Sequence, residues 1–132
     1  MKSIKHIIIL TSMLMIAATA CKKESNSKSI IQLNGLDNGK SVMVTQGEKI
    51  NITLGNPGDG GYVFGSWQYD SSILQLNSHI RVTPTNTSIV GDFGSDVWLF
   101  TALKSGKSAL SITVSRGSAE IQTEFADTVK VQ

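Results

Sequence analysis

The sequence predicts an all-β protein, folded as one antiparallel β-sandwich over residues 30–132. Within this range apolar and polar residues alternate in several short segments, which is the pattern of strands that bury one face. Glycine, serine and asparagine separate these segments at regular intervals, and no segment has its apolar residues at the 3.6-residue spacing of a helix. Seven or more short strands with such connections are typical of two antiparallel sheets packed face to face.

The N-terminal segment is expected to lie outside this domain. Lys2 and Lys5 precede an apolar run over residues 7–20, which is too short to span a bilayer and ends in small residues. Cys21, the only cysteine, follows those small residues directly. The pattern predicts a lipoprotein signal peptide over residues 1–20 and lipidation of Cys21; the alternative is an ordinary secretory signal with a coincidental cysteine.

Residues 21–29 are expected to form a flexible tether between the lipidated Cys21 and the domain, because they are polar and without periodicity. The lipid would hold the protein in the cell envelope, at the outer membrane, on the periplasmic side or at the surface. The whole chain has 12 basic and 10 acidic residues, but acidic residues slightly outnumber basic ones over residues 30–132. With no basic stripe in the domain, we expect no nucleic-acid partner.

The expected strands follow one another through the domain. Gly65 and Ser66 shift the alternation of the second clear strand, which predicts a β-bulge. The segment 97–103 is almost wholly apolar, which predicts a central strand buried on both faces, with Trp98 in the core. Trp67 is also assigned to the core, and Asp127 interrupts the apolar phase of the last strand. The apolar segments lie at 50–54, 62–69, 73–76, 80–82, 97–103, 110–114 and 121–131.

The residues that enzymes need are scarce in this domain. His79 is its only histidine, and no nucleophile elbow or His/Cys cluster with metal-ligand spacing occurs. The segments 39–41 and 106–108 resemble the end of a phosphate-binding loop, but both lack the glycine required five residues earlier. Asp59 lies in a glycine-rich loop without a second carboxylate spaced to help it bind calcium. We therefore expect no catalytic activity, no metal and no cofactor.

Three loops between the expected strands carry the functional signal. The first loop (residues 55–62, Gly-Asn-Pro-Gly-Asp-Gly-Gly-Tyr) holds more glycine than a chain reversal needs, which indicates that its backbone closely approaches another surface. The second loop (residues 90–94) places Phe93 at a turn, and exposed aromatic rings on loops often mark contact sites. The third loop (residues 115–118) joins the last two long strands and by itself predicts only a hairpin.

The order of these pieces resembles the chagasin family of cysteine-protease inhibitors. In that family an Asn-Pro-x-x-Gly-Tyr/Phe loop, a Gly-x-Gly-Gly loop and an Arg-Pro-Trp loop occur in this sequence order. The corresponding pieces of this chain are Asn56-Pro57 with Gly61-Tyr62, then residues 90–94, then Arg116. The resemblance covers roughly residues 42–132.

The resemblance implies an immunoglobulin-like, Greek-key sandwich of about seven to eight strands, whose three loops enter the active-site cleft of a papain-like protease. Glycine-rich backbone can approach a catalytic cysteine and histidine without side-chain clashes, and such a wedge presents no scissile bond for attack. By this resemblance, the expected protease-binding residues are Asn56, Pro57, Gly58, Asp59, Gly60, Gly61, Gly91, Asp92, Phe93, Gly94, Arg116, Gly117 and Ser118.

Each loop departs from the family pattern. The first loop has one extra residue within 58–60, Phe93 replaces a glycine, and Gly117-Ser118 stand where proline and tryptophan are expected. The expected partner is therefore a papain-like protease or a divergent, streptopain-like relative, bound by a monomer. The alternatives are a non-inhibitory envelope module that binds a protein or glycan, and a purely structural lipoprotein domain.

Overall fold

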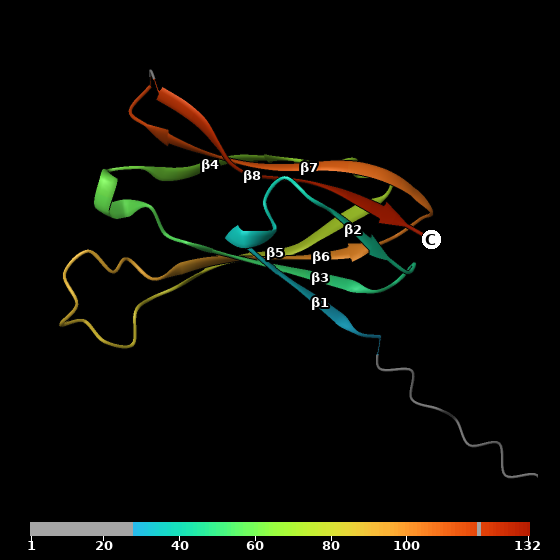
Figure 1. Cartoon of the computed structure of the whole chain (residues 1–132), viewed down its shortest axis with the longest axis horizontal. Helices are drawn as coiled ribbons and strands as arrows, with labels where there is room; N and C mark the ends of the chain where they lie inside the picture. Colours follow the sequence, from blue (N-terminus) through green and yellow to red (C-terminus); the bar gives the residue numbers. More distant parts are fainter. Residues whose placement is uncertain (1–27, 119) are drawn as a thin grey trace, which may run out of the picture.

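The computed structural model describes residues 28–118 and 120–132, so the predicted signal peptide, Cys21 and most of the predicted tether lie outside the described residues. The described chain forms two four-stranded sheets packed face to face (Figure 1). Within it, no helix is long and apolar enough to cross a membrane. The strands are β1 (Ile30–Asn34), β2 (Ser41–Val44), β3 (Lys49–Gly55), β4 (Val63–Gln68), β5 (Leu74–Val82), β6 (Ser95–Ala102), β7 (Gly106–Arg116) and β8 (Glu120–Val131).

The predicted all-β sandwich is confirmed, although its strand pairing is mixed. The sheets have the orders β1-β3-β6-β5 and β2-β8-β7-β4. Four pairs are antiparallel as expected, whereas β1 pairs with β3 and β2 pairs with β8 in parallel. The chain passes from one sheet to the other between β1 and β2, through the short 3-10 helix η1 (Gly35–Asp37). Each sheet thereby gains a parallel edge strand, which strand periodicity alone does not reveal because it is the same for both directions.

The core lies between the inner faces of the two sheets. Ile50, Ile52 and Leu54 point inward from β3, as their alternation predicts. Trp98 is fully buried in the core, and Trp67 packs against the core from β4, its ring centroid 6.3 Å from that of Trp98. The strand β6 is internal to its sheet, but its outer-face residues are half-buried rather than buried.

Bulges explain where the predicted phases agree with the structure and where they fail. The predicted bulge in β4 is confirmed by a register shift between Phe64 and Trp67. The segments 73–76 and 80–82 were expected as separate pieces, but apart from Ile73 they belong to the single strand β5, which has a register shift between Leu76 and Ser78. A further shift after Ile112 changes the phase of β8, so Ile121 is exposed rather than buried.

Candidate functional site

The three loops lie at one end of the sandwich (Figure 1). They are the connections β3–β4, β5–β6 and β7–β8. Every strand that flanks one of these loops is hydrogen-bonded to a neighbouring strand of its own sheet. The first loop forms the 3-10 helix η2 (Gly58–Gly60), in which the Gly60 amide donates to the Pro57 carbonyl at 3.1 Å. Gly61 ends this turn with φ +73°, a left-handed conformation that glycine adopts without steric cost.

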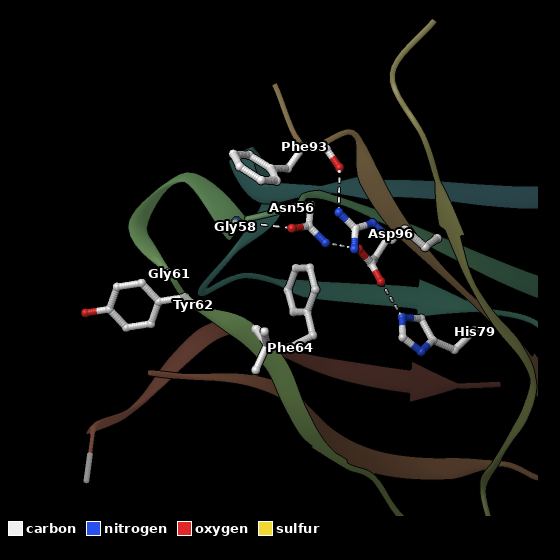
Figure 2. A pocket seen from close by; sticks show the side chains of 10 residues that line it. Asn56, Gly58, Gly61, Tyr62, Phe64, His79, Phe93 and Asp96 are labelled. Atoms are coloured by element: carbon white, nitrogen blue, oxygen red, sulfur yellow. Dashed lines mark hydrogen bonds and ion pairs between the residues drawn. The ribbon is translucent and has the colours of Figure 1, made fainter. Parts of the chain in front are cut away.

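The first and second loops pack directly on each other. The Asn56 amide donates to the Gly94 carbonyl at 2.8 Å. The Phe93 ring covers Gly58 so closely that a Cβ atom added at Gly58 would lie 2.7 Å from Cδ1 of the ring (Figure 2). Gly58 therefore serves a loop–loop contact, and Phe93 braces the first loop while 38% of the residue stays exposed.

The third loop meets the first through an aromatic and charged contact. The Arg116 guanidinium lies 5.1 Å from the Tyr62 ring centroid and pairs with Glu120 at 2.9 Å between Nη2 and Oε2. The Tyr62 hydroxyl donates to Glu120 Oε1 at 2.6 Å. This bond lowers the pKa of Glu120, with help from the Arg116 charge, and it raises the pKa of Tyr62 because ionisation would break it.

The structure brings the sequence-predicted site residues together at this end of the sandwich. They divide into an outer group, which is exposed, and an inner group, which is half-buried. In the outer group, the Asp59 carboxylate accepts from the Gly60 amide at 2.8 Å and keeps its place at the tip of the first loop. The inner residues face the body of the sandwich. The exposed residues are Asp59, Gly60, Gly61, Gly91, Asp92, Phe93, Arg116, Gly117 and Ser118, and the half-buried ones are Asn56, Pro57, Gly58 and Gly94.

A cavity of about 400 Å³ opens between the first and second loops, and two residues of its wall were missed by sequence reasoning (Figure 2). Asp96 of β6 is buried, and its Oδ2 atom accepts a hydrogen bond from Asn56 Nδ2 at 2.7 Å. His79 of β5 places Nε2 2.8 Å from the Asp96 Oδ1 atom. Continuing the buried alternation from Phe100 and Trp98 back by two residues would have placed Asp96 in the core.

No three His, Cys, Asp or Glu side chains gather in the described part of the chain as they would around a metal ion. This end presents exposed backbone, two exposed carboxylates at Asp59 and Asp92, and an exposed guanidinium at Arg116.

Comparisons with known proteins agree on one fold. The cysteine protease inhibitor EhICP2 from Entamoeba histolytica gives a TM-score of 0.68 at 16% identity, over 80% of this chain and 98% of that one. The solution structure of amebosin gives 0.58 at 24% identity, over 79% and 99%. PbICP-C, solved in complex with falcipain-2, gives 0.53 at 14% identity, over 82% and 93%. No curated protein matches the sequence significantly.

These likenesses confirm the immunoglobulin-like sandwich that the resemblance implied. The family model described as Chagasin family peptidase inhibitor I42 matches residues 43–131, from β2 to the last residue of β8, and it includes all three loops. The chain therefore belongs to the chagasin family of peptidase inhibitors.

Proposed function

We propose that this protein inhibits papain-like cysteine proteases by inserting the three-loop end of its sandwich into the active-site cleft. The observation that carries the proposal is the mutual packing of the loops, in which Phe93 covers Gly58 and Arg116 covers Tyr62. Loops that already hold one another lose little conformational entropy on docking. Family membership supports the inhibitory role, and PbICP-C, a protein of similar fold, was solved in complex with the protease falcipain-2.

The chemistry of the tip suits a blocked cleft. Residues 59–61 are exposed and two of the three are glycines, so their backbone can approach the catalytic cysteine and histidine closely. Asp59 and Asp92 add two carboxylates to the surface that would enter the cleft. We therefore favour a target with basic groups at the rim of its cleft, because complementary charge speeds association and repels unsuitable partners. A streptopain-like protease is the second target class to be compared with papain.

The proposed site of action is the cell envelope. It follows from the signal pattern over residues 1–20 and from Cys21, which would carry the lipid. Residues 21–29 would then separate the inhibitory domain from the membrane. Labelling cells with a radioactive fatty acid tests this anchor: the wild-type protein incorporates label and Cys21→Ser does not, whereas equal labelling of both would exclude it.

The inhibitory surface is tested by a bulky residue placed at either end of the sandwich. Asp59→Trp puts a large ring at the tip of the first loop, and Ser105→Trp puts the same ring on the exposed β6–β7 turn. We expect the wild type and Ser105→Trp to inhibit papain or a streptopain-like enzyme equally, and Asp59→Trp to lose at least about tenfold in affinity. Equal inhibition by both variants would place the contact surface elsewhere, and inhibition by none would favour a non-inhibitory binding module.

A further inference from the structure

Asp96 is a buried carboxylate whose side-chain hydrogen bonds connect it to the first loop and to β5. Burying a carboxylate costs free energy unless hydrogen bonds or charges compensate it. The other buried carboxylate, Asp127, leaves Oδ2 without a partner in the described part of the chain. Asp96 has both oxygens engaged, Oδ2 by Asn56 and Oδ1 by His79. The second loop ends at Gly94, and Asp96 is the second residue of β6.

Through Asn56, Asp96 controls the start of the first loop. Because Asp96 Oδ2 accepts from Asn56 Nδ2, the Asn56 side chain is oriented with its NH₂ group toward β6. The Asn56 Oδ1 atom then faces the Gly58 amide, from which it accepts at 3.1 Å (Figure 2). The Asn56 backbone amide donates to the Gly94 carbonyl at 2.8 Å. Asn56 thus joins β6 and the first turn of the first loop through its side chain, and the end of the second loop through its backbone amide.

His79 and Arg81 of β5 hold the same arrangement from the other side. The His79 ring stacks on Trp98 at 4.4 Å and 8°, and its Nε2 atom lies within hydrogen-bond distance of Asp96 Oδ1. Arg81 donates from Nη2 to the Phe93 carbonyl at 3.3 Å. The Asp96 carboxylate is therefore held in place by its contact with the stacked His79 ring as well as by Asn56. Arg81 adds a direct contact between β5 and the second loop.

We propose that Asp96 is a positioning residue for inhibition, which fixes the first and second loops relative to each other through Asn56. The inference rests on the proposed function and adds a residue behind the loops that the contact surface itself does not contain. Hydrogen bonds of a buried side chain are stronger than the same bonds in water, because the local dielectric constant is low. Without Asp96 the loops sample more conformations, and ordering them on docking weakens binding.

A double-mutant cycle tests this inference in the full protein. Asp96→Ala and Asn56→Ala should each raise the inhibition constant by about tenfold, since each removes the same connection. The double variant should be no more than about threefold worse than the weaker single variant, because both residues act through one path. An inhibition constant of Asp96→Ala within about twofold of wild type, or a fully multiplicative double variant, would overturn the inference.

Two further variants separate positioning from general stability. Asp96→Asn keeps the shape and an acceptor for Asn56, so its inhibition constant should lie between those of the wild type and Asp96→Ala. Asp127→Ala removes a buried carboxylate from the other sheet; it should change the melting temperature but leave the inhibition constant within about twofold of wild type. If Asp96→Asn is as impaired as Asp96→Ala, or if Asp127→Ala weakens inhibition to the same extent, the positioning role is excluded.

Amide hydrogen exchange measures the positioning without any protease. In the Asp96→Ala variant, exchange at the Gly58 and Asn56 amides should accelerate by about tenfold, while exchange at Ile112 in the core of β7 stays near the wild-type rate. If the wild type inhibits no papain-like protease, the proposed function fails, yet faster exchange would still assign Asp96 the task of ordering the loops. Unchanged exchange at Gly58 would contradict that task, whatever the inhibition data show.

Discussion

At the scale of the residue, Gly58 shows how a missing side chain lets two loops touch. Its φ is not in the left-handed region, so its role is to provide space rather than conformational freedom. The Phe93 ring occupies the volume that a Cβ atom would need. Sequence analysis assigned both residues to the predicted contact surface and expected the glycine-rich backbone of residues 55–62 to approach another surface closely; at Gly58 a ring of the second loop lies close. That the neighbouring surface includes the protein's own second loop could not be predicted, since no local pattern encodes the contact.

Substitution of Gly58 tests this contact against a matched glycine. In Gly58→Ala the new methyl group meets Phe93, so the ring must move and inhibition should weaken by about tenfold. The free energy that this loss represents lies within the range that overpacking costs at other sites. Gly55→Ala is the control, because its Cβ atom would meet nothing within 4 Å and its φ is not positive. The measurements are the inhibition constant and the melting temperature. Equal inhibition by the two variants would show that the packing of Phe93 on Gly58 is unimportant.

Asp127 gives a second prediction at the residue scale. Burial raises the pKa of its carboxyl above the ordinary value of 3.8. A raised folded-state pKa means that the protonated form is favoured in the folded protein. Burial of the ionised Asp127 carboxylate therefore lowers the stability only slightly below pH 3.8, and by its full amount once pH exceeds the folded-state pKa. Asp127→Asn keeps an acceptor for the Thr128 amide, 3.0 Å away, and removes the buried charge.

We therefore expect Asp127→Asn to melt about 5 °C higher than the wild type at pH 7, which corresponds to about 1 kcal/mol. The difference should shrink as pH falls toward 3.8, and effects of carboxyls shared by both proteins cancel in the comparison. Thermal unfolding from pH 7 to pH 3.5 checks both points. A variant that melts below the wild type at pH 7 would mean that the Asp127 charge is compensated in the fold.

At the scale of the element, strand periodicity located most strands but did not give the phase of every one. The bulge at Gly65-Ser66 was predicted because it breaks an otherwise clear alternation within β4. The bulge after Ile112 was not, because its effect appears in the partner strand β8, where Ile121 turns out to be exposed. The strand β1 likewise has a short and weakly alternating sequence, and its parallel pairing with β3 depends on contacts distant in the chain.

The strand β1 lies before the family-matched residues 43–131, and its contribution to stability can be measured with two leucines. Leu33 on β1 is 8% exposed, whereas Leu36 on η1 is 84% exposed. Leu33→Ala should lower the free energy of unfolding by about 2–3 kcal/mol, as truncation of a buried leucine does. Leu36→Ala should stay within about 0.5 kcal/mol of wild type. Urea denaturation measures both, and equal stabilities would show that β1 is dispensable for the domain.

At the scale of the whole molecule, the sandwich assembles one surface from three connections that are far apart in the sequence: β3–β4, which crosses between the sheets, and β5–β6 and β7–β8, which join paired strands. Residues 58, 93 and 116 are brought to the same end because β3, β6 and β7 all have a loop there. The order of the loop motifs was sufficient to predict the family, and the match of the family model to residues 43–131 confirms it. Beneath the loops, the burial of Asp96 follows from the alternation of β6, but its contact with His79 could not be predicted, because the two residues belong to no motif and meet only through the pairing of β5 with β6.

The most direct test of the account is whether the protein competes for the cleft of its target. Binding is measured by calorimetry to papain, or to a streptopain-like enzyme, in two inactive forms. In one form a methylthio group caps the catalytic cysteine and leaves the cleft open; in the other a peptide-derived covalent inhibitor fills the cleft. Insertion of the three loops predicts one-to-one binding to the open form and at least about a hundredfold weaker binding to the filled form. Equal affinity for both forms would contradict insertion of the three loops into the active-site cleft.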